Sequence, residues 1–136
     1  MNSFYARSVF FVADAERSLR FYVDQLGFAE DWNYREEGRT FVCQVSLFGF
    51  ELILNETDSR TRARAGHGRV FIGLDDDQRE PLRHHILAKG IQFQRVDWGR
   101  PTILIKDVDA NELFVWLPND DFTGFETQAL ESSGTP

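Results

Sequence analysis

The sequence predicts an α+β fold of two βαβββ modules, which form a curved mixed sheet around a concave pocket with the helices outside. A strand pattern followed by a helix pattern occurs twice, in the same order. The arginines that open the two patterns, Arg7 and Arg69, lie 62 residues apart, and the glycines that end the helices, Gly27 and Gly90, lie 63 apart. The length of 136 residues fits one domain.

The first module is predicted over residues 4–55. Residues 5–12 alternate like a strand, and Asp14 then caps a helix whose apolar stripe ends before Gly27. Three further strands are predicted over residues 28–34, 40–47 and 51–55, joined by turns at 36–38 and 48–50.

The second module is predicted over residues 68–117. A strand at 69–74 precedes three aspartates and a helix that ends at Gly90. Strands follow at 91–96, 102–106 and 112–117, with a tight turn at 107–111. The modules share a single domain over residues 1–120, with a polar linker at 56–67 and a polar tail at 121–136.

Composition excludes several classes of partner. The formal net charge of −7 disfavours nucleic acid, because a phosphate-binding protein needs excess positive charge. No apolar run exceeds five residues, so a membrane-spanning helix is not expected. The single cysteine, Cys43, cannot form an intrachain disulfide or a thiolate zinc site. With no signal-peptide pattern at the start, a cytoplasmic location is expected.

Two motifs carry a resemblance to a known family. Residues 21–28 read FYVDQLGF and resemble the "FY…LGF" signature of the glyoxalase, bleomycin-resistance and extradiol-dioxygenase superfamily, also called vicinal oxygen chelate proteins. Residues 107–111 read DVDAN and resemble its "DPDGN" turn. The resemblance extends over residues 4–117 and implies the two-module fold. It leaves function open, since the superfamily holds lyases, isomerases, dioxygenases, transferases and non-catalytic binding proteins.

The resemblance also implies where a catalytic divalent metal would bind, on the first and last strands of each module. Those positions fall on Arg7, Arg69 and Phe114, and Glu51 alone keeps a metal-ligand residue type. A guanidinium has no lone pair for a cation, and a phenyl ring has no donor atom. We therefore expect no metal site of the usual kind and no cofactor.

Strand alternation predicts what lines the concave face instead. We expect aromatic walls around a cluster in which Glu51 lies between Arg7 and Arg69. A Trp-Gly-Arg segment at 98–100 also resembles bleomycin-resistance proteins and adds a tryptophan. The predicted ligand-binding residues are Arg7, Phe11, Glu51, Arg69, Phe71, Trp98, Phe114 and Trp116. A purely structural ion-pair triad remains an alternative.

The sequence thus predicts a metal-free small-molecule-binding protein of bleomycin-resistance type, which sequesters an antibiotic or another aromatic compound as a homodimer. The two arginines suit an anionic ligand. One alternative is a lyase or dioxygenase whose metal site is rearranged around Glu51 and His67. A second alternative is a non-catalytic interaction or regulatory module.

Overall fold

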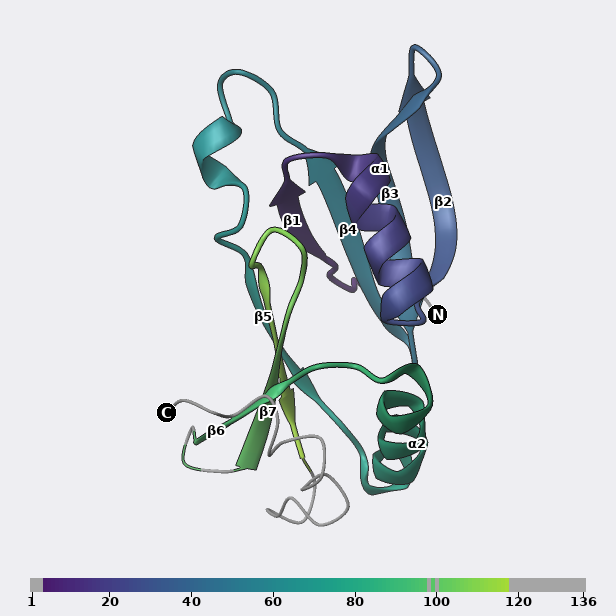
Figure 1. Cartoon of the computed structure of the whole chain (residues 1–136), viewed down its shortest axis with the longest axis vertical. Coiled ribbons are helices and arrows are strands. Elements are labelled where there is room, and N and C mark those ends of the chain that lie inside the picture. Colours follow the sequence, from purple (N-terminus) through teal and green to yellow (C-terminus); the bar gives the residue numbers. More distant parts are fainter. Residues whose placement is uncertain (1–3, 98, 100, 118–136) are drawn as a thin grey trace.

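The computed structural model describes residues 4–97, 99 and 101–117. These residues form two four-stranded mixed sheets and two main helices (Figure 1). The predicted α+β class and the two βαβββ modules are confirmed. Where one curved sheet was expected, the hydrogen bonds define two: sheet A in the first module and sheet B in the second.

Sheet A has the strand order β1-β4-β3-β2. Strands β1 and β4 run parallel, and the other neighbouring pairs are antiparallel. The strands are β1 (Ser8–Val12), β2 (Ala29–Glu36), β3 (Arg39–Leu47) and β4 (Phe50–Glu56). The predicted turns between β2 and β3 and between β3 and β4 are present, and both use positive φ angles, for example at Gly38 and Phe48.

Sheet B repeats this topology with the order β5-β8-β7-β6. Strands β5 and β8 run parallel, and the remaining neighbouring pairs are antiparallel. The strands are β5 (Arg69–Gly73), β6 (Gln94–Asp97), β7 (Pro101–Lys106) and β8 (Glu112–Trp116). The identical strand orders establish the internal repeat that the sequence spacing predicted.

The first helix begins where the sequence predicted. Asp14 is the N-cap of α1 (Ala15–Arg20), and its carboxylate accepts the backbone N–H of Arg17. The helix then continues as one π-helical turn, η1 (Phe21–Gln25), which the sequence did not predict. It ends before Gly27, which has a φ of +78°.

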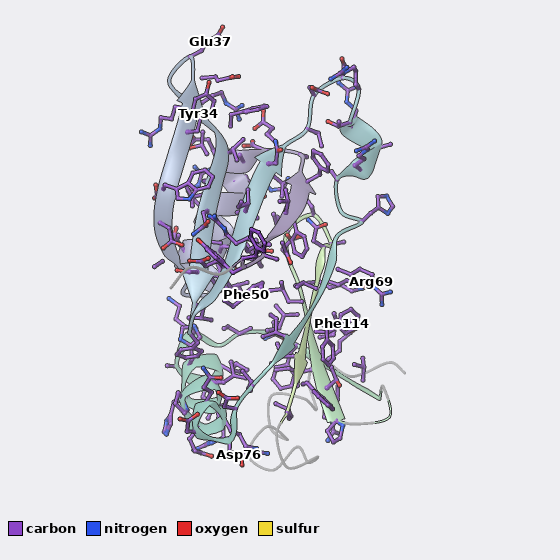
Figure 2. All side chains as sticks on the ribbon, turned by 180° about the vertical axis from the view of Figure 1, so that it is seen from behind. Tyr34, Glu37, Phe50, Arg69, Asp76 and Phe114 are labelled. Atoms are coloured by element: carbon purple, nitrogen blue, oxygen red, sulfur yellow. The ribbon has the colours of Figure 1, made fainter. Side chains whose placement is uncertain are left out.

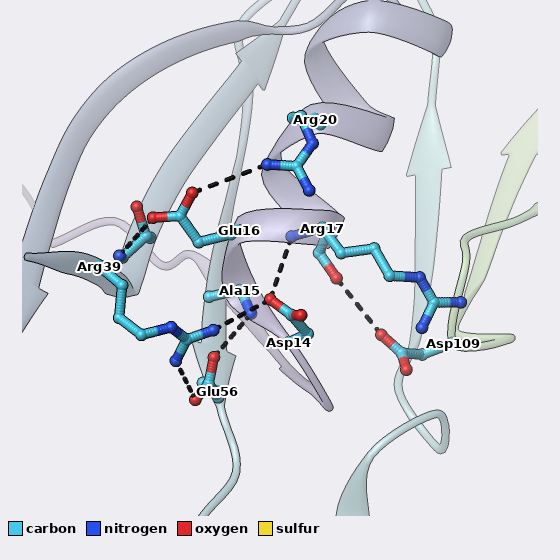
Figure 3. Close-up of polar contacts among 10 residues, drawn as sticks. Asp14, Ala15, Glu16, Arg17, Arg20, Arg39, Glu56 and Asp109 are labelled. Atoms are coloured by element: carbon cyan, nitrogen blue, oxygen red, sulfur yellow. Dashed lines mark hydrogen bonds and ion pairs between the residues drawn. The ribbon is translucent and has the colours of Figure 1, made fainter.

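Polar contacts tie the start of α1 to sheet A (Figure 3). Glu56, at the end of β4, accepts the N–H of Ala15 at 2.9 Å and the guanidinium of Arg39 at 2.7 Å. Glu16 accepts the backbone N–H of Thr40 at 2.7 Å, and this hydrogen bond holds the pKa of that carboxyl below its usual range. These carboxylates satisfy N–H groups at a helix start and a strand start.

The second helix, α2 (Arg79–Lys89), follows a 3₁₀ turn, η3 (Asp76–Gln78). A capping box between Asp75 and Gln78 starts this segment, and Gly90 ends it with a φ of +64°. The polar segment before β5 contains one 3₁₀ turn, η2 (Arg62–Arg64). In the part of the chain that the structure describes, no helix is long and apolar enough to cross a membrane.

One hydrophobic core extends through both modules. It includes Phe10, Val12 and Tyr22 from the first module and Leu82 and Ile86 from the second. Along β1, Phe10 and Val12 are buried, whereas Val9, just before Phe10, is exposed. In each sheet one face contributes to this core, and we call the opposite face the open face.

The two family-like motifs meet at the boundary between the modules. The hydroxyl of Tyr22 donates to Asp107 Oδ2 at 2.8 Å. Asn111 Nδ2 donates to the carbonyl of Phe11 at 3.2 Å, and its Oδ1 accepts the N–H of Gly68 at 2.7 Å. The turn at residues 107–111 therefore fastens the second module onto the first.

Candidate ligand-binding site

The open face of sheet A carries a polar network around Arg7, which precedes β1. The Arg7 guanidinium donates to Gln44 Oε1 at 2.6 Å and lies 3.9 Å from Glu51 Oε1. The side chains of Arg7 and Glu51 are 34% and 37% exposed. The two predicted residues are thus brought together at the surface of the sheet, not in a dry interior.

Gln44 connects this network to β2. Its Oε1 also accepts the indole N–H of Trp32 at 3.2 Å, and its Nε2 donates to Asp31 Oδ2 at 2.8 Å. Gln44 is buried, while the Trp32 ring is 39% exposed. Gln44 was not among the predicted residues; its signal in the sequence is a single glutamine between Cys43 and Val45 in an apolar strand.

The open face of sheet B carries the second set of predicted residues. Arg69 Nε lies 2.8 Å from Glu112 Oε1, and its guanidinium lies 4.9 Å from the ring centroid of Phe114. Figure 2 shows Arg69 and Phe114 on the neighbouring strands β5 and β8. The rings of Phe71 and Trp116 are 5.5 Å apart, so aromatic side chains continue along this face.

Strand register corrects the prediction that Phe114 occupies the position in β8 that Glu51 occupies in β4. Arg69 is opposite Glu112 in the β5–β8 pair, and Ser8 opposite Leu52 places Arg7 opposite Glu51. Glu51 therefore repeats as Glu112, and not as Phe114. Counting residues from the turn at 107–111 does not identify Glu112 as the counterpart of Glu51. Only the pairing of β8 with β5 fixes which residue of β8 lies opposite Arg69.

The expected arrangement of Glu51 between two arginines is consequently wrong. Arg7 is paired with Glu51, and Arg69 is paired with Glu112, each within its own sheet. We call these groups the sheet A half-site (Arg7, Trp32, Gln44 and Glu51) and the sheet B half-site (Arg69, Phe71, Glu112, Phe114 and Trp116). Each arginine has a carboxylate partner, so the charge excess that favoured an anionic ligand is absent from these pairs.

The remaining predicted residues lie apart or cannot be placed. The guanidinium of Arg64 lies 5.8 Å from the ring centroid of Phe11. Phe11, Arg64 and His67 line a shallow hollow beside η2, and His67 is exposed there. Trp98 lies outside the described residues.

The residues at the family's metal positions do not fit a metal ion. Arg7 and Arg69 bring fixed positive charges, and the glutamates opposite them, Glu51 and Glu112, are each within ion-pair distance of one of these arginines. Among the residues that the structure describes, no three His, Cys, Asp or Glu side chains are grouped so that they could hold a metal ion. Burial raises the pKa of Cys43 to about 12, which keeps its thiol protonated.

An apolar cavity lies elsewhere, at the module boundary. Its volume is about 420 Å³. Among the predicted residues within the described part of the chain, Phe71 alone lines it. In the half-sites, the partly exposed Trp32 and Phe71 offer planar stacking contacts, whereas Phe114, near the Arg69 guanidinium, is buried.

Solved structures with the same fold include antibiotic-binding proteins and an enzyme. A bleomycin-binding protein from Streptomyces verticillus, complexed with copper(II)-bleomycin, is 17% identical with a TM-score of 0.63, covering 88% of this chain and all of that chain. TnmS3, an antibiotic-binding protein from Streptomyces sp. CB03234, is 19% identical with a TM-score of 0.57, at 88% and 100% coverage. A lactoylglutathione lyase from Agrobacterium tumefaciens is 18% identical with a TM-score of 0.57, at 86% and 95% coverage.

The sequence itself supports a family assignment. No curated protein sequence matches the chain. A family model does match, over residues 5–113, which include both motifs and seven of the eight strands. The chain belongs to the Glyoxalase/Bleomycin resistance protein/Dioxygenase superfamily.

Proposed function

We propose that the protein binds a planar aromatic small molecule on the open faces of its sheets, without a metal and without turning the ligand over. The carrying observation is the replacement of metal-ligand residues by Arg7 and Arg69, each paired with a glutamate beside aromatic side chains. Similarity in fold to a bleomycin-binding protein and to TnmS3 supports the same proposal. An antibiotic is therefore a reasonable ligand class.

The paired charges refine the expected ligand. In each half-site the arginine is within ion-pair distance of a glutamate, so neither sign of charge dominates. Such a surface accepts a ligand whose rings stack on the aromatic side chains. The polar groups of the ligand would replace one partner in an arginine–glutamate pair. We propose a neutral or zwitterionic aromatic compound in place of a simple anion.

We further propose that two copies of the chain close the site as a homodimer. Both open faces expose large apolar side chains, among them Val9, Tyr34 and Phe71. A two-fold pairing would cover such surfaces and enclose a ligand between the copies. Light scattering should then report a mass near twice the 15.8 kDa of one chain; a monomer at micromolar concentration contradicts this part of the proposal.

Calorimetric titration with bleomycin, and with acidic, basic and zwitterionic aromatic compounds, tests the binding function. We expect saturable binding that Trp32→Ala and Arg69→Gln weaken. Leu87→Ala is the control, because Leu87 is as exposed as Trp32 but lies on α2. If no compound binds, or if the control weakens binding equally, the proposal fails.

The enzymatic alternative can be distinguished from binding alone by its metal content. A lyase or dioxygenase built around Glu51 and His67 needs a bound divalent ion. Elemental analysis of purified protein that finds one equivalent of tightly bound metal, together with conversion of the ligand, would favour that alternative over binding alone.

A further inference from the structure

The apolar cavity at the module boundary is enclosed on one side by the second module. Six apolar side chains form this wall: Leu82 and Ile86 from α2, Ile72 from β5, Leu74 just after β5, and Leu113 and Val115 from β8. The volume of about 420 Å³ lies within the range of small-molecule sites. The cavity is therefore large enough, and this wall is apolar enough, to enclose a small organic molecule.

The opposite wall comes from the first module and is aromatic. Phe28 and Phe50 line the cavity there, beside Leu26. The rings of Tyr22, Phe28 and Phe50 contact one another edge to face, with centroids 5.2 and 6.4 Å apart. Tyr22 is fully buried, so this row of rings is fixed from behind and the wall is preformed.

Two exposed phenyl rings stand among the lining residues. Phe48 is 43% and Phe71 is 45% exposed. The Phe48 ring lies edge-on to His85 at 5.8 Å. Phe48 also has a φ of +53°, a conformation that few residues other than glycine, asparagine and aspartate adopt. The turn between β3 and β4, which this positive φ belongs to, thus places an exposed ring beside the cavity.

Polar groups around the cavity are few and already engaged. Among the lining residues that the structure describes, the side chains with polar atoms are Gln78 and His85. Gln78 Oε1 accepts the backbone N–H of Asp75. His85 Nε2 lies 2.6 Å from the carbonyl of Leu26, and because a carbonyl only accepts, this nitrogen carries the proton.

The chemistry of the walls selects the occupant. A charged group would be desolvated there without a partner. A peptide segment would leave its backbone N–H and C=O groups without side-chain partners. Cavities lined by leucine, isoleucine and phenylalanine are poor sites for water but bind apolar ring compounds. An uncharged small molecule is thus favoured over both a second chain and a segment of this chain.

We propose that this cavity is a second binding site, which takes an uncharged apolar molecule with a flat ring system. It does not depend on the proposed open-face site, because Phe71 is the one half-site residue that also lines the cavity. The two sites are therefore separable by mutation, provided that Phe71 is left unchanged.

Fluorescence titration of the full chain with N-phenyl-1-naphthylamine tests the proposal. This uncharged probe brightens in apolar surroundings. In the Trp32→Ala variant, whose open-face site is weakened, we expect saturable probe binding with a concentration-dependent rise in melting temperature. Leu74→Trp, which fills the cavity from the position just after β5, should weaken binding at least about tenfold. Phe48→Asn removes an exposed ring, suits the positive φ and should weaken binding a few-fold.

Matched controls separate the two sites. Leu87→Ala should leave probe binding unchanged, since Leu87 does not line the cavity, and Trp32→Ala should remove only probe bound at the open face. Unchanged affinity in Leu74→Trp and Phe48→Asn, with melting curves that show both variants folded, overturns the proposal. So does probe affinity that falls as the chain dimerises, which would identify a second copy as the occupant. Tighter probe binding after Phe122→Ser and Phe125→Ser would identify the C-terminal tail and equally overturn it.

Discussion

The phenol of Tyr22 donates a hydrogen bond of 2.8 Å to Asp107 Oδ2, across 85 residues of sequence. Tyr22 belongs to the FYVDQLGF motif of the first module, and Asp107 opens the DVDAN turn of the second. Burial raises the pKa of the Asp107 carboxyl, while this hydrogen bond and those from Asn111 and the turn backbone oppose the shift. Burial, together with the negative charge of Asp107, raises the pKa of Tyr22 well above its usual range.

Tyr22→Phe should destabilise the fold by about 1–3 kcal/mol near neutral pH, because it leaves a buried carboxylate one donor short. The hydrogen bond lowers the pKa of Asp107, so its contribution is present above that pKa and lost as the pH falls through it. Urea unfolding at several pH values should therefore show that the difference in unfolding free energy between the wild type and Tyr22→Phe becomes smaller in acid. Tyr34→Phe, which removes an exposed bond to Glu36, is the control and should change little. A difference that is independent of pH would contradict this account.

Gly27→Ala should cost more stability than Gly38→Ala, although both glycines have a positive φ near +80°. A Cβ on Gly38 meets open space, so only the backbone strain of about 1–2 kcal/mol applies. A Cβ on Gly27 would lie 2.5 Å from the His85 ring, which its bond to Leu26 holds in place. The added cost should be about 1–3 kcal/mol in chemical denaturation. It should disappear in a His85→Ala background; if it persists there, contact with His85 is not its cause.

Glu51→Gln and Glu112→Gln should each change the free energy of unfolding by no more than about 1 kcal/mol, because exposed ion pairs contribute little. Arg7 and Glu51 are both about one-third exposed, and Arg69 is 60% exposed. Thermal unfolding at low and high salt measures the effect. A loss of several kcal/mol in either variant would mean that the pair is shielded from solvent in the assembled protein.

Cys43 should resist thiol reagents in the folded protein. Its side chain is fully buried, and burial raises its pKa to about 12, so the reactive thiolate is scarce near neutral pH. Ellman's reagent should react only as fast as the chain unfolds, and at once in guanidinium chloride. Rapid labelling of the native protein would show that β3 opens locally.

Zinc, nickel, manganese or iron(II) should not raise the melting temperature. The Arg7 and Arg69 guanidinium groups cannot donate to a cation, and Glu51 and Glu112 are each paired with one of them. A chelator-treated sample provides the baseline. A metal-dependent rise that Glu51→Gln or Glu112→Gln abolishes would reveal a rearranged site and revive the enzymatic alternative.

Much of the fold was predictable because it is encoded locally. Asp14 as N-cap, Gly90 as the C-terminal stop of α2 and the tight turn before β8 all follow from preferences of a few adjacent residues. The π-helical turn at 21–25 was not predictable, since its apolar spacing also suits an ordinary helix. The strand repeat predicted two modules, but not that their hydrogen bonds form two separate sheets.

The sequence by itself determined the family, the duplicated topology and the chemistry available at the first strand of each module, because residue type and spacing carry that information. Only the tertiary structure decided which groups pair. Parallel pairing of β5 with β8 brings Glu112 opposite Arg69, and no local pattern reports the register of two strands 43 residues apart. The module boundary, where Tyr22 meets Asp107 and His85 meets Gly27, likewise exists only once both cores have packed together.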